Sequence, residues 1–539
     1  MADSPQNWVG DWSGKRAALS TDRVGLVDAA TGTEYTYGDL DERANRCARL
    51  LSDHDVTLGC GQSADTGGPI DGGEPAEAGG RVAVVSRNRP EYVDLFFATA
   101  KTGGVLAPLS HRLAPPELAE LLGDVDPELL VVEEPFADLV GDAVAAEERD
   151  TDCATLSLAV DGESTWDTYA EALPDEDGAF DGPTVAPDGP HLFLHTGGST
   201  GTPKETILSH EGIVWNSVNT ITAWGLRDDD VTPMVFPMFH TGGWNVLTVP
   251  LFHMGGEVVI DREFDPAQIL DIVEDRSASV LVAVPAVLRM MVEHDRWSDT
   301  DLSSLRFVKS GGGPCRESVM EAWWDRGVDL SQGYGLTECG PNNFAMPDDW
   351  SREKAHTVGV ANMHVDARVV DDDGTELPTG ETGELELRSP HAGEGYWRAP
   401  EETAETFGEW VSTGDLARVD EDGYVSIAGR KKNLFVSGGE NVYPAEVEDA
   451  IADHPRVADA VVVPVADEQW GQVGKAVVEP TDEAADTDGD PLTLAELWDF
   501  LDSRLARFKP PRHLAFVDEL PTSGPSKIDR DAIEAEFGE

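Results

Sequence analysis

Apolar runs and helical patterns alternate along much of this chain. The runs at residues 81–85 and 105–108 are predominantly apolar, and residues 92–103 between them place apolar side chains at helical spacing. The run at 280–284 is apolar at every position, which is typical of a strand covered on both faces. Strands and helices that alternate in this way predict a parallel α/β sheet.

The pattern changes after residue 370. Short strands and tight turns follow, such as Asp372-Asp373-Gly374, and they predict a β-rich subdomain at the end of a large domain. The last part of the chain predicts a small α/β domain, with its elements at residues 444–451, 460–465, 475–478 and 494–505. We therefore expect a large domain over residues 1–430 and a small domain over residues 431–539.

The chain of 539 residues is strongly acidic. Lysine and arginine number 39 against 103 aspartate and glutamate residues, which gives a formal net charge of −64. Such a field repels nucleic acids and anionic membranes, so neither is an expected partner. The composition resembles that of proteins from salt-accumulating halophiles, because an ionic strength of about 1 M shortens the screening length to about 3 Å.

The cysteines and the N-terminus bear on the compartment. The five cysteines show no paired spacing, so they predict neither a disulfide framework nor a zinc site, as in a reducing interior. They are Cys47, Cys60, Cys153, Cys315 and Cys339. Residues 1–20 contain no apolar signal core, and no uncharged apolar run is long enough to span a bilayer. We expect a soluble, cytoplasmic protein.

Residues 195–204 carry the clearest chemistry. Glycines let the backbone approach an anion, hydroxyl and turn N–H groups donate to it, and a lysine adds positive charge. Pro203 before Lys204 distinguishes the segment from the common nucleotide loop, in which Gly-Lys-Ser/Thr runs into a helix. We interpret the segment as a phosphate cradle, and the alternative is a polar surface loop. Its candidate ligands are Thr196, Gly197, Gly198, Ser199, Thr200, Gly201 and Lys204.

Two further turns follow apolar strands. The glycine run 311–313 comes after the strand at 307–310, at a point where the backbone can approach a flat ligand. Tyr334 lies between two glycines, with Thr337 and Glu338 just beyond it. This arrangement suits an aromatic platform beside a ligand for a hard cation such as Mg²⁺, and the alternative is a β-turn with a core tyrosine.

Later segments add charged and flexible positions. His240 lies where a strand runs into a glycine turn, and a satisfied strand-end histidine is the alternative to a functional role. Asp415 ends a Thr-Gly-Asp turn, and residues 430–432 form one of the few cationic clusters, which favours an anionic ligand nearby. Residues 437–439 are a flexible Ser-Gly-Gly turn. Lys527 lies in a Gly/Pro/Ser loop, where a lysine is ordinarily a solvated surface charge.

Taken in order, these motifs resemble the adenylate-forming superfamily of acyl-CoA synthetases, luciferases and peptide-synthetase adenylation domains. The resemblance runs from about residue 35 to residue 530 and includes Tyr-Gly-Leu-Thr-Glu at 334–338 and Lys-Ile-Asp-Arg at 527–530. It implies a luciferase-like α/β fold, with a large N-terminal domain of stacked α/β sheets plus a β-rich subdomain. The small C-terminal domain would be mobile, with its hinge at Lys432.

The resemblance also implies a role for each motif. The cradle would surround the ATP phosphates, with Thr337 contacting the α-phosphate and with Glu338 and Thr200 binding Mg²⁺. The nucleoside would be held by Gly311, Gly312, Gly313, Tyr334, Gly335, Asp415 and Arg430, the last two at the ribose. Lys527 would bridge the acyl carboxylate and the α-phosphate. The coenzyme A arm would pass Ser437, Gly438 and Gly439.

The implied reaction is acid–CoA ligation. Acid and ATP give acyl-adenylate and pyrophosphate, and coenzyme A then gives acyl-CoA and AMP. Joining two anions requires positive charge and positioning rather than a protein nucleophile. The acyl pocket would be lined by His240, Trp244, Asn245 and Gly333, none of them a lysine or arginine. Residues 239–243 and 340–342 resemble those of fatty-acyl and medium-chain acyl-CoA synthetases, which implies an aliphatic, medium- or long-chain fatty acid as the substrate. The alternatives are an aryl or other acid–CoA ligase and a stand-alone adenylation or binding module without transfer to coenzyme A. A homodimer is a further expectation.

Three positions depart from the family pattern. Ser199 replaces threonine but keeps the hydroxyl, and Ser526 precedes Lys527 where glycine is usual. Glu205 follows Lys204 where a small residue is usual. A carboxylate beside a phosphate site would repel the phosphate unless its side chain is turned outward, and the sequence leaves the effect of Glu205 open.

Overall fold

The computed structural model describes residues 9–58, 79–146, 153–160, 162–196, 204–437, 440–467, 470–481, 484, 492–502, 504–522 and 528–538. Most of the predicted loop at 57–80, the centre of the phosphate cradle at 197–203, and Ser526 with Lys527 lie outside these residues. The described residues include the strands on both sides of the cradle.

A seven-stranded sheet forms the centre of the large domain, in the order β18-β8-β7-β4-β3-β5-β6. The strands β3 to β7 are parallel, as predicted, whereas β8 runs antiparallel to β7 and β18 antiparallel to β8. Their bounds are β3 Arg81–Val85, β4 Val105–Leu109, β5 Leu129–Glu133, β6 Ala154–Leu158, β7 Pro190–Thr196, β8 Lys204–Ser209 and β18 Gly395–Tyr396.

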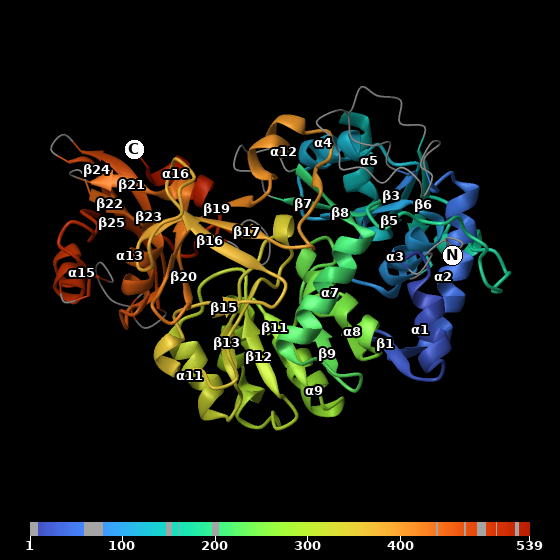
Figure 1. The fold of residues 1–539 in the computed structure, drawn as a ribbon, viewed down its shortest axis with the longest axis horizontal. Coiled ribbons are helices and arrows are strands. Elements are labelled where there is room, and N and C mark those ends of the chain that lie inside the picture. Colours follow the sequence, from blue (N-terminus) through green and yellow to red (C-terminus); the bar gives the residue numbers. More distant parts are fainter. Residues whose placement is uncertain are drawn as a thin grey trace.

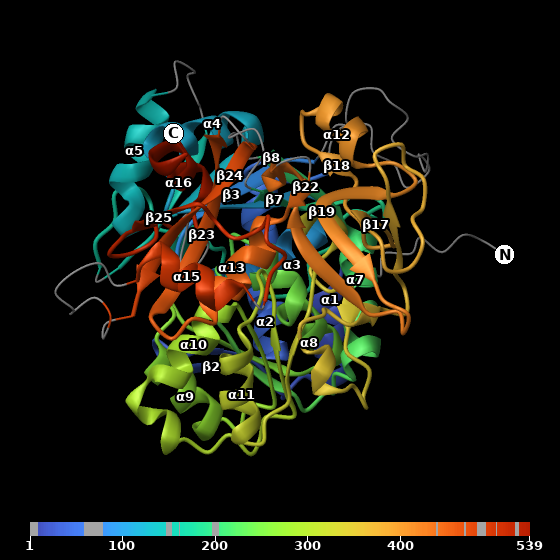
Figure 2. The same cartoon turned by 90° about the vertical axis from the view of Figure 1, so that its left-hand side faces the viewer.

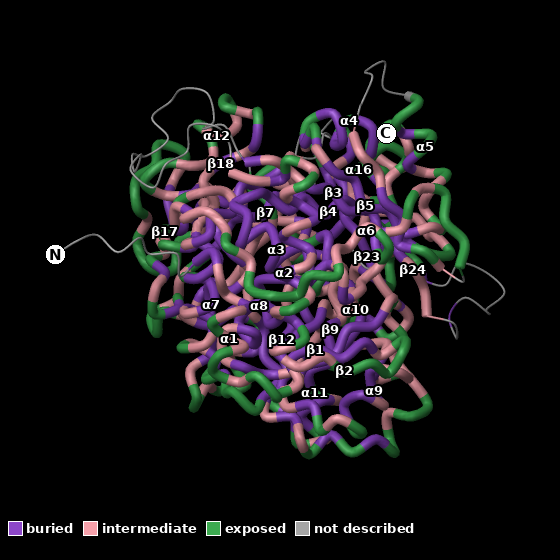
Figure 3. The backbone as a smooth tube through the Cα atoms, turned by 90° about the vertical axis from the view of Figure 1, so that its right-hand side faces the viewer, coloured by how far each residue is buried: buried purple, intermediate pink, exposed green. Residues whose placement is uncertain are grey.

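Helices cover both faces of this sheet. Val82 and Val84 of β3 pack into one core with α2 (Tyr37–Asp53) and α3 (Pro90–Thr102). The alternate residues Ala83 and Val85 pack into a second core with helices on the other side, α4 (Pro115–Val125) and α5 (Ala137–Ala146). Because both faces are buried, the strands are apolar throughout rather than alternating. Figure 3 shows this burial along the tube.

Two smaller sheets complete the lower part of the large domain in Figure 1. Their strands are β1 Val24–Asp28, β2 Thr33–Thr36, β9 Val231–Met234, β10 Glu257–Ile260, β11 Val280–Ala283, β12 Phe307–Ser310 and β13 Leu330–Gln332. The surrounding helices are α1 Trp12–Ser20, α7 His210–Trp224, α8 Thr248–Met254, α9 Pro266–Asp275, α10 Pro285–Glu293 and α11 Glu317–Asp325. The loops after β12 and β13 carry predicted nucleotide ligands, so these two strands position that part of the site.

The β-rich subdomain is an antiparallel sheet in the order β16-β17-β19-β20. Its strands are β16 Asp366–Val370, β17 Thr382–Arg388, β19 Val411–Val419 and β20 Val425–Arg430. A short pair, β14 Phe344–Ala345 and β15 Val360–Ala361, lies before it in the chain, and α12 Pro400–Thr406 interrupts it. The predicted subdomain after residue 370 is therefore present, and its sheet begins slightly earlier, at Asp366.

The C-terminal unit has its own sheet and its own core. It contains β21 Phe435–Ser437, β22 Glu440–Val442, α13 Pro444–Ala452, β23 Val457–Asp467, β24 Gly471–Pro480, α15 Leu494–Leu501, β25 His513–Phe516 and α16 Arg530–Phe537. The helix predicted over 494–505 ends at Leu501. Figure 1 shows this unit far from α1 and α2, and Figure 2 views the molecule from its side. The Arg316 guanidinium and the Asp459 carboxylate, 3.1 Å apart, connect it to the large domain.

Two further features concern the helices and the cysteines. Among the described helices, none combines the length and apolar character needed to cross a bilayer. The described cysteines Cys47, Cys153, Cys315 and Cys339 are free thiols, and Cys60 lies outside the described residues.

Candidate active site

The two ends of the phosphate cradle lie opposite each other on neighbouring strands. Thr196 ends β7 and Lys204 begins β8, and the two residues are register partners. The Thr196 hydroxyl donates to the Lys204 carbonyl over 3.5 Å. The candidates Gly197, Gly198, Ser199, Thr200 and Gly201 lie outside the described residues. The strand pairing brings the chain back at the C-terminal edge of the parallel strands, where α/β sheets bind ligands.

Lys204 and Glu338 both contact the side chain of Tyr396. The Lys204 ammonium lies 5.6 Å from the centre of the Tyr396 ring, and the Tyr396 hydroxyl donates to Glu338 Oε1 at 2.9 Å. Glu338 and Thr337 lie in a short 3₁₀ turn, Thr337–Cys339. Lys204 also forms an ion pair with Glu402 of α12, with 3.3 Å between Nζ and Oε1. The structure therefore brings together the predicted phosphate lysine and the predicted metal carboxylate.

A second group surrounds Asp415. The Tyr334 hydroxyl donates to Asp415 Oδ2 at 2.5 Å, and Arg430 Nε lies 2.9 Å from Oδ1. Asp415 and Arg430 are register partners on β19 and β20, so the sheet itself sets their separation. Burial and then Asp415 raise the pKa of Tyr334 well above its usual range, so the hydroxyl stays a donor. The three residues predicted around the nucleoside thus form one connected cluster.

The glycine-rich loops lie side by side at the ends of β12 and β13. The Gly333 amide donates to the Ser310 carbonyl at 2.8 Å, which places residues 311–313 beside Tyr334. Gly312 has a φ of +84°, in the left-handed region that favours glycine. A Cβ at Gly335 would lie 2.1 Å from the Pro341 backbone carbon, so glycine is required there for a close backbone approach.

The predicted acyl-pocket residues divide into two pairs. His240 is exposed, with its ring 4.6 Å from Phe239, and Gly333 is half-buried. Trp244 is fully buried, stacks on the Phe96 ring at 4.9 Å and donates Nε1–H to the Met238 carbonyl at 2.6 Å. Asn245 is likewise buried, in the π-helical turn Gly242–Val246. Trp244 and Asn245 therefore lie in the core behind His240, and their role in the pocket stays a prediction.

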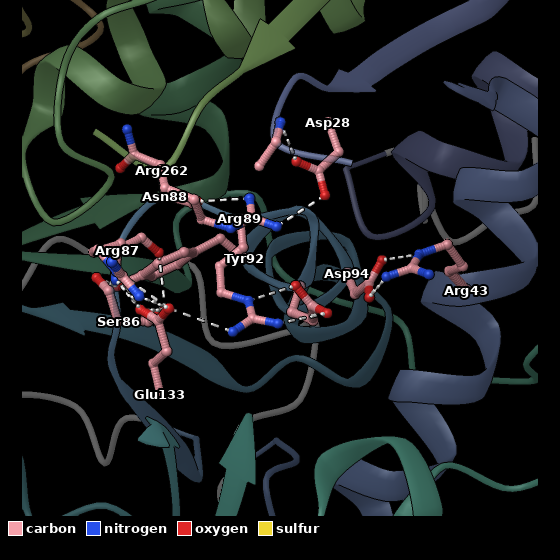
Figure 4. A network of polar contacts seen from close by, with 12 residues as sticks. Asp28, Arg43, Ser86, Arg87, Asn88, Arg89, Tyr92, Asp94, Glu133 and Arg262 are labelled. Carbon is pink, nitrogen blue, oxygen red and sulfur yellow. Dashed lines mark hydrogen bonds and ion pairs between the residues drawn. The ribbon is translucent and has the colours of Figure 1, made fainter. Parts of the chain in front are cut away.

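An arginine that sequence reasoning missed lies beside this region. The Arg112 guanidinium is 5.6 Å from the centre of the Phe239 ring. It follows β4, the neighbour of β7, and His111 Nδ1 lies 3.1 Å from the Ser86 carbonyl. Ser86 belongs to a polar network that includes the Arg87–Glu133 pair (Figure 4). The sequence position of Arg112 could have revealed it, because side chains that follow neighbouring parallel strands lie at the same edge of the sheet.

The Glu205 side chain is turned away from Lys204 and is buried in the protein. Strand alternation places its side chain on the opposite face of β8 from Lys204, together with Ile207, which belongs to the core of α4 and α5. Neither carboxyl oxygen of Glu205 has a hydrogen-bond partner among the described residues. Burial, and secondarily Asp124, raises the pKa of Glu205 to about 8. The expected repulsion of phosphate is avoided because the side chain points away from the site and retains its proton at neutral pH.

The cationic cluster at 430–432 is paired with carboxylates. Lys431 Nζ lies 2.9 Å from Glu384 Oε2, and Lys432 Nζ lies 3.9 Å from Asp531 of α16. Ser437 is buried at the end of β21, whereas Gly438, Gly439 and Lys527 lie outside the described residues. Within the part of the chain that is described, no group of three or more His, Cys, Asp or Glu side chains could hold a metal ion.

Comparison with known proteins places the chain in a family. The model of AMP-binding enzymes matches residues 75–397, and the model of the AMP-binding enzyme C-terminal domain matches residues 446–527. The chain belongs to the AMP-binding enzyme family, as the motifs implied.

Two relatives and one solved structure show the extent of the similarity. A feruloyl-CoA synthase from Amycolatopsis sp is 34% identical over 531 residues, covering 98% of this chain and 99% of the relative. An indoleacetate–CoA ligase from Aromatoleum aromaticum is 37% identical over 459 residues, covering 84% and 87%. The crystal structure of ATP-bound MatB from Rhodopseudomonas palustris has a TM-score of 0.84 at 29% identity, covering 98% and 99%.

These findings define the class of enzyme. The chain is an AMP-forming acid–CoA ligase of the adenylate-forming superfamily, and the predicted fold class is confirmed. Enzymes of this class use ATP, Mg²⁺ and coenzyme A.

Proposed function

We propose that this enzyme activates an apolar monocarboxylic acid. ATP would bind between two clusters, one formed by Lys204, Tyr396 and Glu338 and the other by Asp415, Tyr334 and Arg430. One observation carries the proposal. The loop from Tyr334 to Glu338 contributes to both groups, because Tyr334 binds Asp415 at one end and Glu338 binds Tyr396 at the other. A ligand with a nucleoside and a phosphate chain matches these two ends.

The residues have distinct tasks in this proposal. Asp415 accepts hydrogen bonds from the ribose hydroxyls while Arg430 and Tyr334 hold it in place. Lys204 attracts the phosphates, and Thr337 donates to the α-phosphate. None of these side chains becomes bonded to substrate, because adenylation needs positioning and charge stabilisation.

Glu338 fits the Mg²⁺ role. A carboxylate offers the hard oxygen donors that Mg²⁺ prefers, and Mg²⁺ is usually held by one or two carboxylates plus substrate phosphates. Thr200, the second predicted ligand, lies outside the described residues. When bound, the ion neutralises charge on the phosphates. Tyr396 holds Glu338 Oε1, so one side of the carboxylate is fixed by the protein.

The second half-reaction is assigned to the C-terminal unit. We place the domain boundary after residue 430, with Lys432 as the hinge, and we assign the coenzyme A arm to residues 437–439. Lys527 would approach the acyl carboxylate in the first step only. The separate core of the C-terminal unit supports this division.

The acid is proposed to be aromatic, with the aliphatic acid predicted from the sequence as the second candidate. Two relatives above 30% identity carry the names feruloyl-CoA synthase and indoleacetate–CoA ligase. Beside His240, the buried rings of Phe239 and His195 stack on each other with 6.0 Å between their centres, so the surroundings of His240 are aromatic.

A panel of acids tests the proposal. Coenzyme A-dependent AMP release should be highest with hydroxycinnamic or indole-acetic acids, lower with medium-chain fatty acids and absent with amino acids. Medium-chain acids that surpass every aromatic acid would restore the aliphatic assignment. A preference for amino acids or dicarboxylates would overturn the apolar pocket.

A further inference from the structure

The segment β18–α12 crosses the phosphate side of the site. Tyr396 pairs with Thr206 of β8, two residues after Lys204. The Tyr396 amide donates to Thr403 Oγ1 at 2.9 Å, and the Thr403 hydroxyl donates in turn to the Ala399 carbonyl at 2.8 Å. Both ends of the segment are thereby fixed, one by the sheet and one by α12.

Tyr396 contacts two functional residues with two parts of its side chain. Its hydroxyl donates to Glu338, and the face of its ring lies beneath the Lys204 ammonium. The Phe407 ring packs against it edge-on at 5.1 Å and limits its rotation.

Glu402 is the counter-ion of Lys204. The Lys204 side chain is 15% exposed and that of Glu402 is 39% exposed, so the pair borders solvent and can open. A phosphate that binds Lys204 competes with this carboxylate, because the two anions repel each other and share a single positive charge.

We propose that Tyr396 is a positioning residue that orients Glu338, and that Glu402 is a built-in competitor which a phosphate of ATP displaces from Lys204. This proposal rests on the proposed roles of Lys204 and Glu338. It adds which groups hold the two side chains, namely Tyr396 for Glu338 and Glu402 for Lys204.

Tyr396→Phe tests the positioning role. Loss of a hydrogen bond to a charged group should raise the Mg²⁺ concentration needed for half-maximal adenylation about tenfold. In calorimetry, the extra ATP affinity gained on adding Mg²⁺ should shrink by the same factor, while binding without Mg²⁺ should not change. The matched control is Tyr424→Phe, because Tyr424 also lies beneath a lysine but contacts neither Lys204 nor Glu338. The Lys354 ammonium is 4.9 Å from the centre of the Tyr424 ring. An unchanged Mg²⁺ dependence in Tyr396→Phe would overturn the role.

Glu402→Gln tests the competition. The dissociation constant of ATP should fall about two- to fivefold, as expected for removal of one half-exposed ion pair, and the gain should shrink as KCl rises. Glu401→Gln is the control, because Glu401 precedes Glu402 on the same helix and is exposed. Equal or weaker ATP binding by Glu402→Gln would exclude Glu402 as a competitor.

Lys204→Ala separates this inference from the proposed function. If Lys204→Ala leaves ATP affinity unchanged, the assigned role of the lysine is wrong. If Lys204→Ala weakens ATP binding while Glu402→Gln does not strengthen it, the proposed function stands and the competitor role fails.

Discussion

The proposed ribose side, around Asp415, and the proposed phosphate side, around Lys204, are built in different ways. Asp415 is buried and held by two donors, and its partner Arg430 is fixed by strand register. Lys204 faces a half-exposed carboxylate on a helix that is distant in the sequence. The ribose side is therefore formed within the protein, whereas the phosphate side is balanced by an ion pair that a ligand can replace.

Lowering the salt concentration should have the largest effect on both sides. With a net charge of −64, repulsion is long-ranged in dilute buffer and screened in molar salt. We expect activity, and then the fold, to be lost below a few tenths molar KCl. The half-exposed phosphate side should fail first. Circular dichroism measures the loss of the fold, and AMP release measures the loss of activity. If both are unchanged in low salt, the acidic surface does not make the enzyme dependent on salt.

Lys527→Ala should have the next largest effect, on the phosphate side alone. Removing a charge that acts mainly in the transition state should slow adenylation by about 10²–10³-fold. Thioester formation from supplied acyl-adenylate should persist. Lys432→Pro is the complementary variant, because restricting the backbone at the proposed hinge should slow the second step and spare the first. Equal loss of both steps in Lys527→Ala, with the fold intact, would contradict the two-step assignment.

Asp415→Asn should weaken the ribose side by a smaller factor. The asparagine amide keeps the shape of the carboxylate but loses the negative charge that pairs with Arg430 and would accept hydrogen bonds from the ribose hydroxyls. ATP affinity should therefore fall by about 10- to 100-fold. Adenosine, which lacks phosphates, should lose the same factor. Asp420→Asn is the control, because Asp420 is paired with Lys354 at 2.6 Å in the same subdomain. A loss seen with ATP but not with adenosine would place Asp415 on the phosphate side.

Glu205→Gln should have the smallest effect, on stability. The folded state raises the pKa of Glu205 from its ordinary 4.5 to about 8, so the folded chain binds more protons between these values. The raised pKa of Glu205 therefore does not destabilise the fold below about pH 4.5, and the destabilisation grows as the pH rises to about 8. The variant should be more stable than the natural chain by about 1–3 kcal/mol at pH 8, with the gain fading toward pH 5. Denaturant titrations at both pH values measure it, and a gain independent of pH would contradict the buried-acid explanation.

The sequence motifs bring together the residues around Asp415, whereas the contacts around Lys204 were predictable only in part; the nucleotide-binding roles of both clusters stay predictions. Tyr334, Asp415 and Arg430 lie in motifs whose spacing survives in the fold. Tyr396 was missed because β18 is too short to give a strand pattern and its pairing with β8 is non-local. The direction of the Glu205 side chain was left open, because it depends on whether Lys204 and Glu205 lie in a strand, where successive side chains alternate between faces. The burial of Trp244 depends on packing against Phe96, which no local pattern encodes.

The most direct test is the exchange of labelled pyrophosphate into ATP in the absence of coenzyme A. The exchange requires the ribose side, the phosphate side and the acid to act together, and it isolates the first half-reaction. The account predicts exchange that depends on an apolar acid and on Mg²⁺, and that Asp415→Asn and Lys204→Ala each reduce. Exchange without acid, or acyl-CoA formation with no exchange under any condition, would contradict it.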